Sequence, residues 1–148
     1  MSLKSPNISV IVTTYNRPDA LQVVLLALAQ QTQLPNQVVV ADDGSTQETR
    51  LLIGQLQNQL NYPLQHVWQK DEGFQAAKIR NKAALCAHSN YLIFLDGDCV
   101  PFPDFIENHR LLAEPNWFVS GHRVLLEKQF TQKILQELLP IYKQSTLE

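Results

Sequence analysis

Residues 91–98 have the sequence YLIFLDGD, in which five apolar or aromatic residues lead into two aspartates separated by one glycine. An unbroken apolar run of this length is typical of a strand that is buried on both faces of a parallel sheet. Open α/β sheets bind ligands at the carboxyl ends of their strands, where Asp96 and Asp98 would emerge. Carboxylate oxygens suit Mg²⁺ or Mn²⁺, and Gly97 would leave room between them for a cation or a diphosphate. The stretch favours a metal site, although two acids in a turn can also be solvated or capping residues.

The rest of the chain alternates segments of strand type with segments in which apolar residues recur at helical spacing. The predicted strands are 8–13, 38–41, 64–68, 91–95 and 117–120, and the predicted helices are 18–31, one that includes 52–60, 74–88, one that ends near 113, and 130–142. This alternation predicts an α/β fold with a doubly wound, mostly parallel sheet and helices on both faces. Without repeats or long linkers, residues 7–142 are expected to form one domain, with 1–6 and 143–148 as tails or vector-derived ends.

The composition excludes several classes of function. Twelve basic and 14 acidic residues among 148 leave no positive excess for a nucleic-acid backbone, so no nucleic-acid partner is expected. Cys86 and Cys99 form neither a disulfide framework nor a metal-ligand spacing, which fits a reducing cytoplasm. The longest aliphatic stretch, 23–29, is too short to span a bilayer, and no signal sequence precedes it. We expect a cytoplasmic protein without a transmembrane segment, with peripheral membrane association left open.

Polar residues follow three of the predicted strands. They are residues 13–17, 42–43 and 96–98. Because the carboxyl ends of neighbouring parallel strands face one crevice, the three groups should meet there. Each group alone also has a structural interpretation, as a turn, a helix cap or an Asx turn. Their convergence favours a ligand site, in which Asp42 could accept hydrogen bonds from a base or a ribose, Tyr15 could stack on a base, and Arg17 could bind phosphate.

Two basic residues of the predicted helix 74–88 differ in their surroundings. Arg80 falls on the packed side of the helix, where an arginine needs a partner. That partner is either Asp42 or Asp43, in a buried ion pair, or a bound nucleotide. Lys78 falls on the opposite side, which is typical of a solvated lysine. The four histidines have no ligand spacing and are interpreted as surface or half-buried residues.

Four motifs in series resemble those of the family 2 glycosyltransferases. They are ISVIVTTYNR at 8–17, VADDGS at 40–45, DEGFQAAKIRN at 71–81 and LDGD at 95–98. The third motif is most similar to the bacterial chondroitin-polymerase branch. The resemblance implies the GT-A nucleotide-diphospho-sugar fold, an inverting transfer from a UDP-sugar donor to a saccharide acceptor in polysaccharide or glycoconjugate synthesis, and a divalent cation, Mn²⁺ or Mg²⁺.

The resemblance also implies roles for single residues. Thr14, Tyr15, Arg17 and Asp42 would hold the nucleoside, Lys78 and Arg80 would lie near the base and phosphates, Asp96 would contact ribose or sugar, and Asp98 would ligate the metal. Members of the family carry a catalytic base downstream, usually in a Glu-Asp or Asp-Asp pair. Beyond Asp104 the chain has isolated glutamates at 107, 114, 127, 137 and 148, none in such a pair. The chain therefore resembles a donor-binding half, either truncated or degenerate, with the base expected beyond its end.

Three other classes of function share part of this pattern. A nucleotidyltransferase would carry a glycine-rich phosphate loop after the first strand, and residues 13–17 contain no glycine. A haloacid-dehalogenase-like phosphatase also uses an Asp-x-Asp after a strand, but it needs a further lysine and an acid pair for which too little chain remains. A catalytically incomplete nucleotide-sugar-binding or interaction domain stays open, because no catalytic base is visible.

Overall fold

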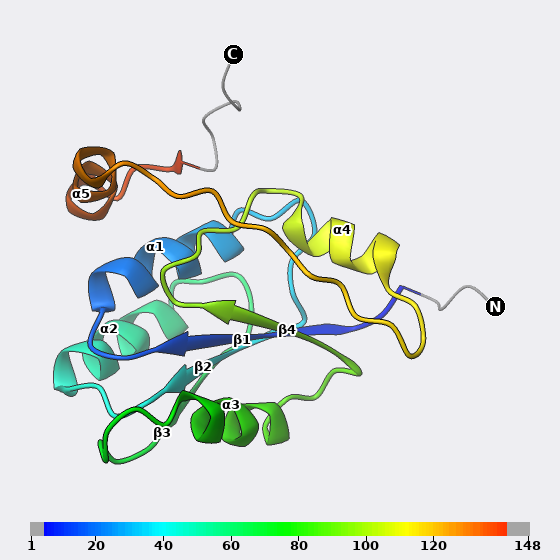
Figure 1. Cartoon of the computed structure of the whole chain (residues 1–148), viewed down its shortest axis with the longest axis horizontal. Helices are drawn as coiled ribbons and strands as arrows, with labels where there is room; N and C mark the ends of the chain where they lie inside the picture. Colours follow the sequence, from blue (N-terminus) through cyan, green and yellow to red (C-terminus); the bar gives the residue numbers. More distant parts are fainter. Residues whose placement is uncertain (1–4, 142–148) are drawn as a thin grey trace.

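The structure is a computed structural model that describes residues 5–141, and its elements alternate as the sequence predicts (Figure 1). The elements in these residues are β1 (Ile8–Thr14), α1 (Pro18–Leu28), β2 (Gln37–Asp42), α2 (Gln47–Gln57), β3 (Leu64–Trp68), α3 (Ala76–Leu85), β4 (Tyr91–Asp96), α4 (Phe105–Leu112) and α5 (Lys128–Glu137). The strands form one parallel sheet in the order β3-β2-β1-β4. The predicted doubly wound parallel sheet is confirmed.

Apolar side chains cover both faces of the central strands, whereas the prediction that the strand at 91–95 is buried on both faces is wrong: in β4 only Ile93 is buried, and Phe94 is 55% exposed. On one face, the central strands pack against α1, α2 and α4; the buried residues there include Val10, Val12, Leu25, Ile53 and Ile106. On the other face, a smaller cluster joins the strands to α3 through Ile11, Val39, Ala41, Ile79 and Ala83. Figure 1 shows α1 and α4 on one side of the sheet and α3 on the other. Because helices cover both faces, the middle parts of the central strands, residues 10–12 and 38–41, are continuously apolar.

The strand order places a crevice between β1 and β4. The chain moves outward from β1 to β2 and β3, and α3 then returns it to the other side of β1. Such a reversal separates the connections on either side and leaves a ligand crevice at the carboxyl ends of the two strands. Thr13 of β1 pairs in register with Asp96 of β4, and Thr14 pairs with Asp42 of β2. The predicted polar groups therefore lie along one edge of the sheet.

The predicted strand 117–120 is wrong. Residues 113–127 form neither helix nor strand, and Trp117 and Phe118 are 76% and 88% exposed. Aromatic and β-branched residues favour a strand only where a neighbouring strand pairs with their backbone and packs against their side chains. In the described structure this segment has no such neighbour, so its local preference is not realised.

Helix ends also differ from the prediction. α3 begins at Ala76 instead of residue 74, because the Gln75 N–H donates to Asp43 Oδ2 at 2.8 Å and Phe74 is left 93% exposed. α5 ends at Glu137, and the predicted helix end at residue 142 lies outside the described residues, as do the tail residues 1–4 and 143–148. No helix within residues 5–141 is long and apolar enough to cross a membrane.

Candidate functional site

The loops that follow β1 and β2 are joined by reciprocal hydrogen bonds. The Asn16 N–H donates to Ser45 Oγ at 2.8 Å, and the Thr46 N–H donates to Asn16 Oδ1 at 2.9 Å. Asn16 has φ +48°, a left-handed conformation that asparagine tolerates better than most residues. Tyr15 and Arg17 stand on either side of it in the chain. For Asn16 the sequence offered a turn or cap role beside a place in the ligand site, and the structure shows that it links the two loops.

Asp42 is completely buried under the β2–α2 loop. Its Oδ1 accepts a hydrogen bond from the Ser45 N–H at 2.8 Å, and its Oδ2 lies 2.8 Å from His66 Nε2. Burial alone would raise the pKa of Asp42, but the hydrogen bonds from His66 and Ser45 outweigh it and hold the pKa below its ordinary value. The Asp42 carboxylate therefore stabilises the observed conformation of the β2–α2 loop. Its contact with a nucleoside remains a prediction.

His66 is a residue that sequence reasoning missed as a partner of the site. It pairs with Val40 in the β2–β3 register, so it lies on the same face as Asp42, two residues further along β2. Gln65 and His66 are two adjacent polar residues in the short strand β3, and these were the available signal. The sequence pattern did not identify the partner of His66, because Asp42 is 24 residues away in sequence.

Asp43 and Asp71 connect the first loops to the segment before α3. Asp43 accepts hydrogen bonds from Gln69 Nε2 at 2.6 Å and from the Gln75 N–H at 2.8 Å. Asp71 Oδ2 accepts a hydrogen bond from Tyr15 Oη at 2.9 Å, and this bond is the main cause of the raised pKa of Tyr15. The Asp71 backbone packs directly on Gly44, where a Cβ would lie 2.6 Å from Asp71 Cα. Asp71 opens the third motif, but no role was predicted for it.

Arg80 bridges β1 and β4 from α3. Its Nε donates to Thr13 Oγ1 at 2.9 Å, and its Nη2 donates to Asp96 Oδ1 at 2.8 Å. Of the two alternatives for the Arg80 partner, an ion pair with an acid such as Asp42 or Asp43 is wrong in the identity of the acid, which is Asp96, and contact with a nucleotide stays a prediction. Asp42 is committed to the loop above α2, whereas the α3 face presents Thr13 and Asp96 to this arginine. Lys78 lies on the exposed side of α3, as predicted, and its Nζ is 3.9 Å from the Glu72 carboxylate.

The acid pair of the opening motif lies just beyond this bridge. One ligand atom each from Asp96, Asp98 and Cys99 fall within 4.8 Å of one another. Within the described residues Asp98 has no partner except Cys99 Sγ, at 3.7 Å. Burial, followed by the charges of Asp98 and Asp96, raises the pKa of the Cys99 thiol, so the carboxylates are the ready ligands. Two exposed carboxylates fit a hard divalent cation, and Asp98 is the freer of the two.

Gly97 has a different reason for being glycine than the sequence suggested. Its N–H donates to the Thr13 carbonyl at 2.8 Å, and a Cβ at this position would lie 2.7 Å from the same oxygen. Such a contact is closer than real Cβ atoms tolerate. The missing side chain is therefore required by the backbone of β1. That Gly97 also allows close approach by a cation or a diphosphate stays a prediction.

Arg17 and Glu107 both have hydrogen-bond partners outside the acid pair. Arg17 forms a two-pronged ion pair with Asp19 at 2.9 and 3.2 Å, which is the main cause of its raised pKa, and the charge of Asp98 adds to the rise. Glu107 Oε2 accepts a hydrogen bond from Thr32, which follows α1. In the described residues no hydrogen bond joins Glu107 to Asp96 or Asp98.

Known proteins are similar to this chain in sequence and in structure. The sequence model described as Glycosyl transferase family 2 matches residues 9–146. Chondroitin synthase of Escherichia coli is 34% identical over 123 residues, which are 81% of this chain and 18% of that protein. The structure of S. aureus TarS 1-349 in complex with UDP-GlcNAc is 30% identical with a TM-score of 0.57, over 69% of this chain and 29% of that one.

A second solved structure, the mannosyltransferase PcManGT from Pyrobaculum calidifontis in complex with GDP-Man and Mn²⁺, has a TM-score of 0.66 at 26% identity, over 77% of this chain and 34% of that one. The chain thus spans between 18% and 34% of the length of each of these proteins. The predicted resemblance to the chondroitin-polymerase branch is confirmed. Since the family match extends over nearly the whole chain and the solved relatives share its sheet, the chain belongs to glycosyltransferase family 2 and has the GT-A fold.

Proposed function

We propose that this chain is the donor-binding part of a metal-dependent, inverting glycosyltransferase that uses a UDP-sugar and a saccharide acceptor. The observation that carries the proposal is the placement of Asp98, with a nearly unpartnered carboxylate, beside the Thr13–Asp96 strand pair at the β1–β4 crevice. A crevice of this kind is where open α/β sheets bind nucleotides. TarS in complex with UDP-GlcNAc supports a UDP-sugar donor, and the likeness to chondroitin synthase supports a saccharide acceptor.

The nucleoside would lie along the ends of β1 and β2. Tyr15 offers a half-exposed ring, held by Asp71, on which a base can stack. Thr14 Oγ1 is buried and has no hydrogen-bond partner in the described residues. A polar group of the bound UDP-sugar, or an ordered water, could form a hydrogen bond with this hydroxyl. Asp42 would act here either by direct contact or, as its present bonds favour, by fixing the loop that surrounds the nucleoside.

The diphosphate and sugar would lie toward β4. Asp98 would hold Mn²⁺ or Mg²⁺, Asp96 would contact the ribose or sugar, and Lys78 and Arg80 would supply positive charge from α3. PcManGT in complex with Mn²⁺ supports a cation of this class. A bound cation would neutralise the negative charge that develops on the departing diphosphate. Arg17 is near enough to Asp98 to sense its charge and would add a second positive group once it turns from Asp19 to phosphate.

A test of donor binding separates the metal from the nucleotide. Isothermal calorimetry of the chain with UDP is expected to show binding with Mn²⁺ and at least a tenfold loss of affinity with EDTA, which corresponds to about 1.4 kcal/mol. GDP under the same conditions serves as the control for base selectivity. Equal UDP affinity with Mn²⁺ and with EDTA would contradict the role of the cation.

A second candidate is a nucleotide-sugar-binding domain that does not transfer sugar. It is favoured by one observation: within the described residues, no acid pair lies downstream of Asp98, and Glu107 is bound to Thr32. A transfer assay with radiolabelled UDP-sugars and a panel of oligosaccharides distinguishes the two. General-base assistance contributes about 10²–10⁴-fold to rate, so a domain without it should bind UDP yet give almost no product.

A further inference from the structure

We infer that Arg80 is a positioning residue that holds the Asp96 carboxylate against β1, so that Asp98 alone presents a free carboxylate to a cation. The inference rests on the proposed donor-binding function and divides the two acids of the motif between two tasks. Asp96 would be pre-oriented for the ribose or sugar, and Asp98 would be left for the metal. The family resemblance already implies this division between Asp96 and Asp98, and the Arg80 bridge supplies a structural reason for it.

The geometry of the bridge is the first step. Arg80 uses two different nitrogens on two different strands, with Nε on Thr13 and Nη2 on Asp96, at 2.9 and 2.8 Å. Thr13 and Asp96 are register partners in the β1–β4 pair, so one planar guanidinium bridges the ends of two adjacent strands. Hydrogen bonds from two points of a rigid plane fix both its position and its tilt. The Asp96 carboxylate is consequently oriented as well as neutralised.

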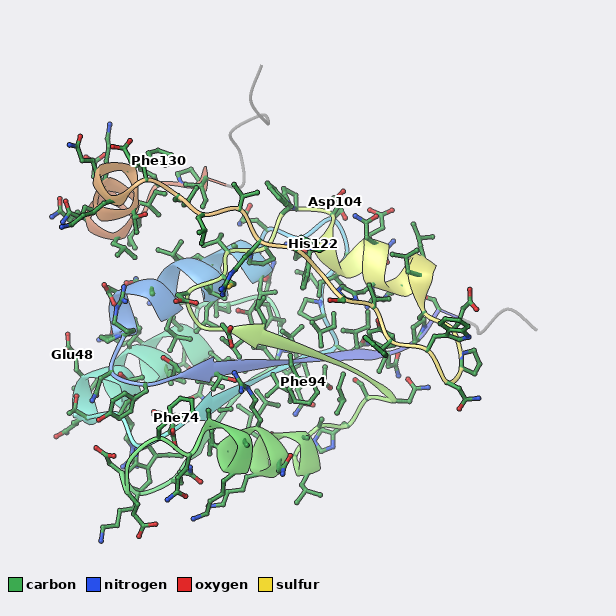
Figure 2. The ribbon with its side chains drawn as sticks, viewed as in Figure 1. Glu48, Phe74, Phe94, Asp104, His122 and Phe130 are labelled. Atoms are coloured by element: carbon green, nitrogen blue, oxygen red, sulfur yellow. The ribbon has the colours of Figure 1, made fainter. Side chains whose placement is uncertain are left out.

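The second step is the anchoring of the arginine itself. Its neighbour Ile79 is fully buried in the cluster that joins α3 to Ile11 and Val39. The helix start is tied to β2, because the Gln75 N–H donates to Asp43. The backbone of Arg80 is therefore fixed against the sheet. Figure 2 shows α3 lying along the sheet below β4, with Phe94 of β4 on the side that faces the helix.

The third step is the balance of charge. Asp96 and Asp98 lie close enough for their ligand atoms to fall within 4.8 Å, so two free carboxylates would repel each other. Arg80 offsets the charge of Asp96, whose side chain remains 51% exposed and accessible to a donor. An ion pair with this much exposure contributes little to folding stability. Its loss should therefore alter donor binding without unfolding the chain.

The competing interpretation is direct contact between Arg80 and the diphosphate. Nη1 of Arg80 has no hydrogen-bond partner in the described part of the chain, so this nitrogen can still donate to a phosphate oxygen. The two roles differ in one respect. A positioning arginine loses its effect when Asp96 can no longer be held as a carboxylate, whereas a phosphate-binding arginine keeps its effect.

A double-mutant cycle tests this difference. The UDP affinity with Mn²⁺ is measured by calorimetry for wild type, Arg80→Ala, Asp96→Asn and the double variant. We expect Arg80→Ala to weaken binding about tenfold in the wild-type background and less than about twofold in the Asp96→Asn background. Arg80→Lys should lose nearly as much as Arg80→Ala, because lysine keeps the charge but cannot bridge both acceptors in one plane. Lys82→Ala, an exposed change on the same helix, is the matched control and should bind as wild type.

The results that would overturn the inference are distinct. Equal losses from Arg80→Ala in both backgrounds, or full affinity in Arg80→Lys, would show that Arg80 acts on the donor directly or by charge alone, and would leave the donor-binding function standing. Failure of wild type to bind UDP under any condition would overturn the proposed function and the role of Arg80 together. Thermal unfolding of each variant, expected within a few degrees of wild type, confirms that the comparison is made on folded protein.

Discussion

Two pairs of aspartates lie at the same edge of the sheet and have opposite surroundings. Asp42 and Asp43, at the end of β2, are 0% and 4% exposed, and every one of their carboxylate oxygens has a partner. Asp96 and Asp98, at the end of β4, are exposed, and Arg80 is the one charged partner of the pair in the described residues. The comparison teaches that position at a strand end makes an acid a candidate for binding, while the remaining hydrogen-bonding capacity decides whether it is free to bind.

The largest expected effect is on stability, at the buried pair. Asp42→Ala removes the partner of the Ser45 N–H and leaves His66 without its carboxylate, so we expect the free energy of unfolding to fall by about 3 kcal/mol and the melting temperature by about 10 °C. Urea unfolding followed by circular dichroism measures the first quantity. An unchanged urea midpoint combined with lost UDP binding would make Asp42 a nucleoside ligand and would remove the contrast between the two pairs.

The next effect is on binding, at the exposed pair. Asp98→Asn should leave the free energy of unfolding within about 0.5 kcal/mol of wild type, because the carboxylate has almost no partner to lose. It should lower UDP affinity with Mn²⁺ at least tenfold and bring it close to the value of wild type in EDTA. Asp104→Asn, at another exposed aspartate beyond the site, is the control. Mn²⁺-dependent binding by Asp98→Asn as strong as by wild type would move the metal to other ligands.

A smaller effect is on the pH dependence of stability. The folded-state pKa of Asp42 lies below its unfolded value, so its contribution is fully present above about pH 4 and is lost as pH falls through the folded-state pKa. Asp42→Asn should therefore show a shallower fall in urea midpoint than wild type when pH is lowered from about 5 to 2.5. Asp19→Asn should remove less of the slope, because its ion pair with Arg17 is half exposed and screened by solvent. Parallel curves for wild type and Asp42→Asn would contradict the assignment.

The smallest effect concerns the ring of Tyr15, which is held by Asp71. Tyr15→Phe removes the hydrogen bond to Asp71 but keeps the stacking surface, so UDP affinity should fall by less than about threefold. Asp71→Asn should lower the pKa of Tyr15 toward its ordinary value, since the Asp71 hydrogen bond and charge are the main causes of the rise. Tyrosine ring resonances followed by NMR across alkaline pH give that pKa. A Tyr15 pKa that does not move in Asp71→Asn would show that the two groups do not interact in solution.

Much of the fold was predictable, because local pattern and global packing agree. The apolar runs 8–13 and 38–41 predicted β1 and β2, and the alternation with helices predicted the parallel sheet. The edge on which the polar groups meet followed from the topology alone. Strand 117–120 failed because an isolated segment of high strand preference still needs a paired neighbour.

The partners within the site were less predictable. Helical spacing placed Arg80 on the packed side of α3, but its partner depends on how α3 lies across β1 and β4, which no local pattern encodes. Asp42 and His66 meet through the β2–β3 register, and a histidine within a weak strand carries no mark of its distant partner. The contacts that distinguish a structural acid from a free one are thus tertiary, and the sequence indicated only where they would lie.

Gly97 has a consequence for the dimensions of the crevice. Its lack of a side chain lets the residue after β4 continue the hydrogen bonding to β1 at the Thr13 carbonyl, so the two strands stay close together up to the acid pair. An alanine at 97 would act as a wedge, forcing apart the two acceptors that a single guanidinium must reach together. Gly97 thus keeps the ends of β1 and β4 close enough for Arg80 to bind both.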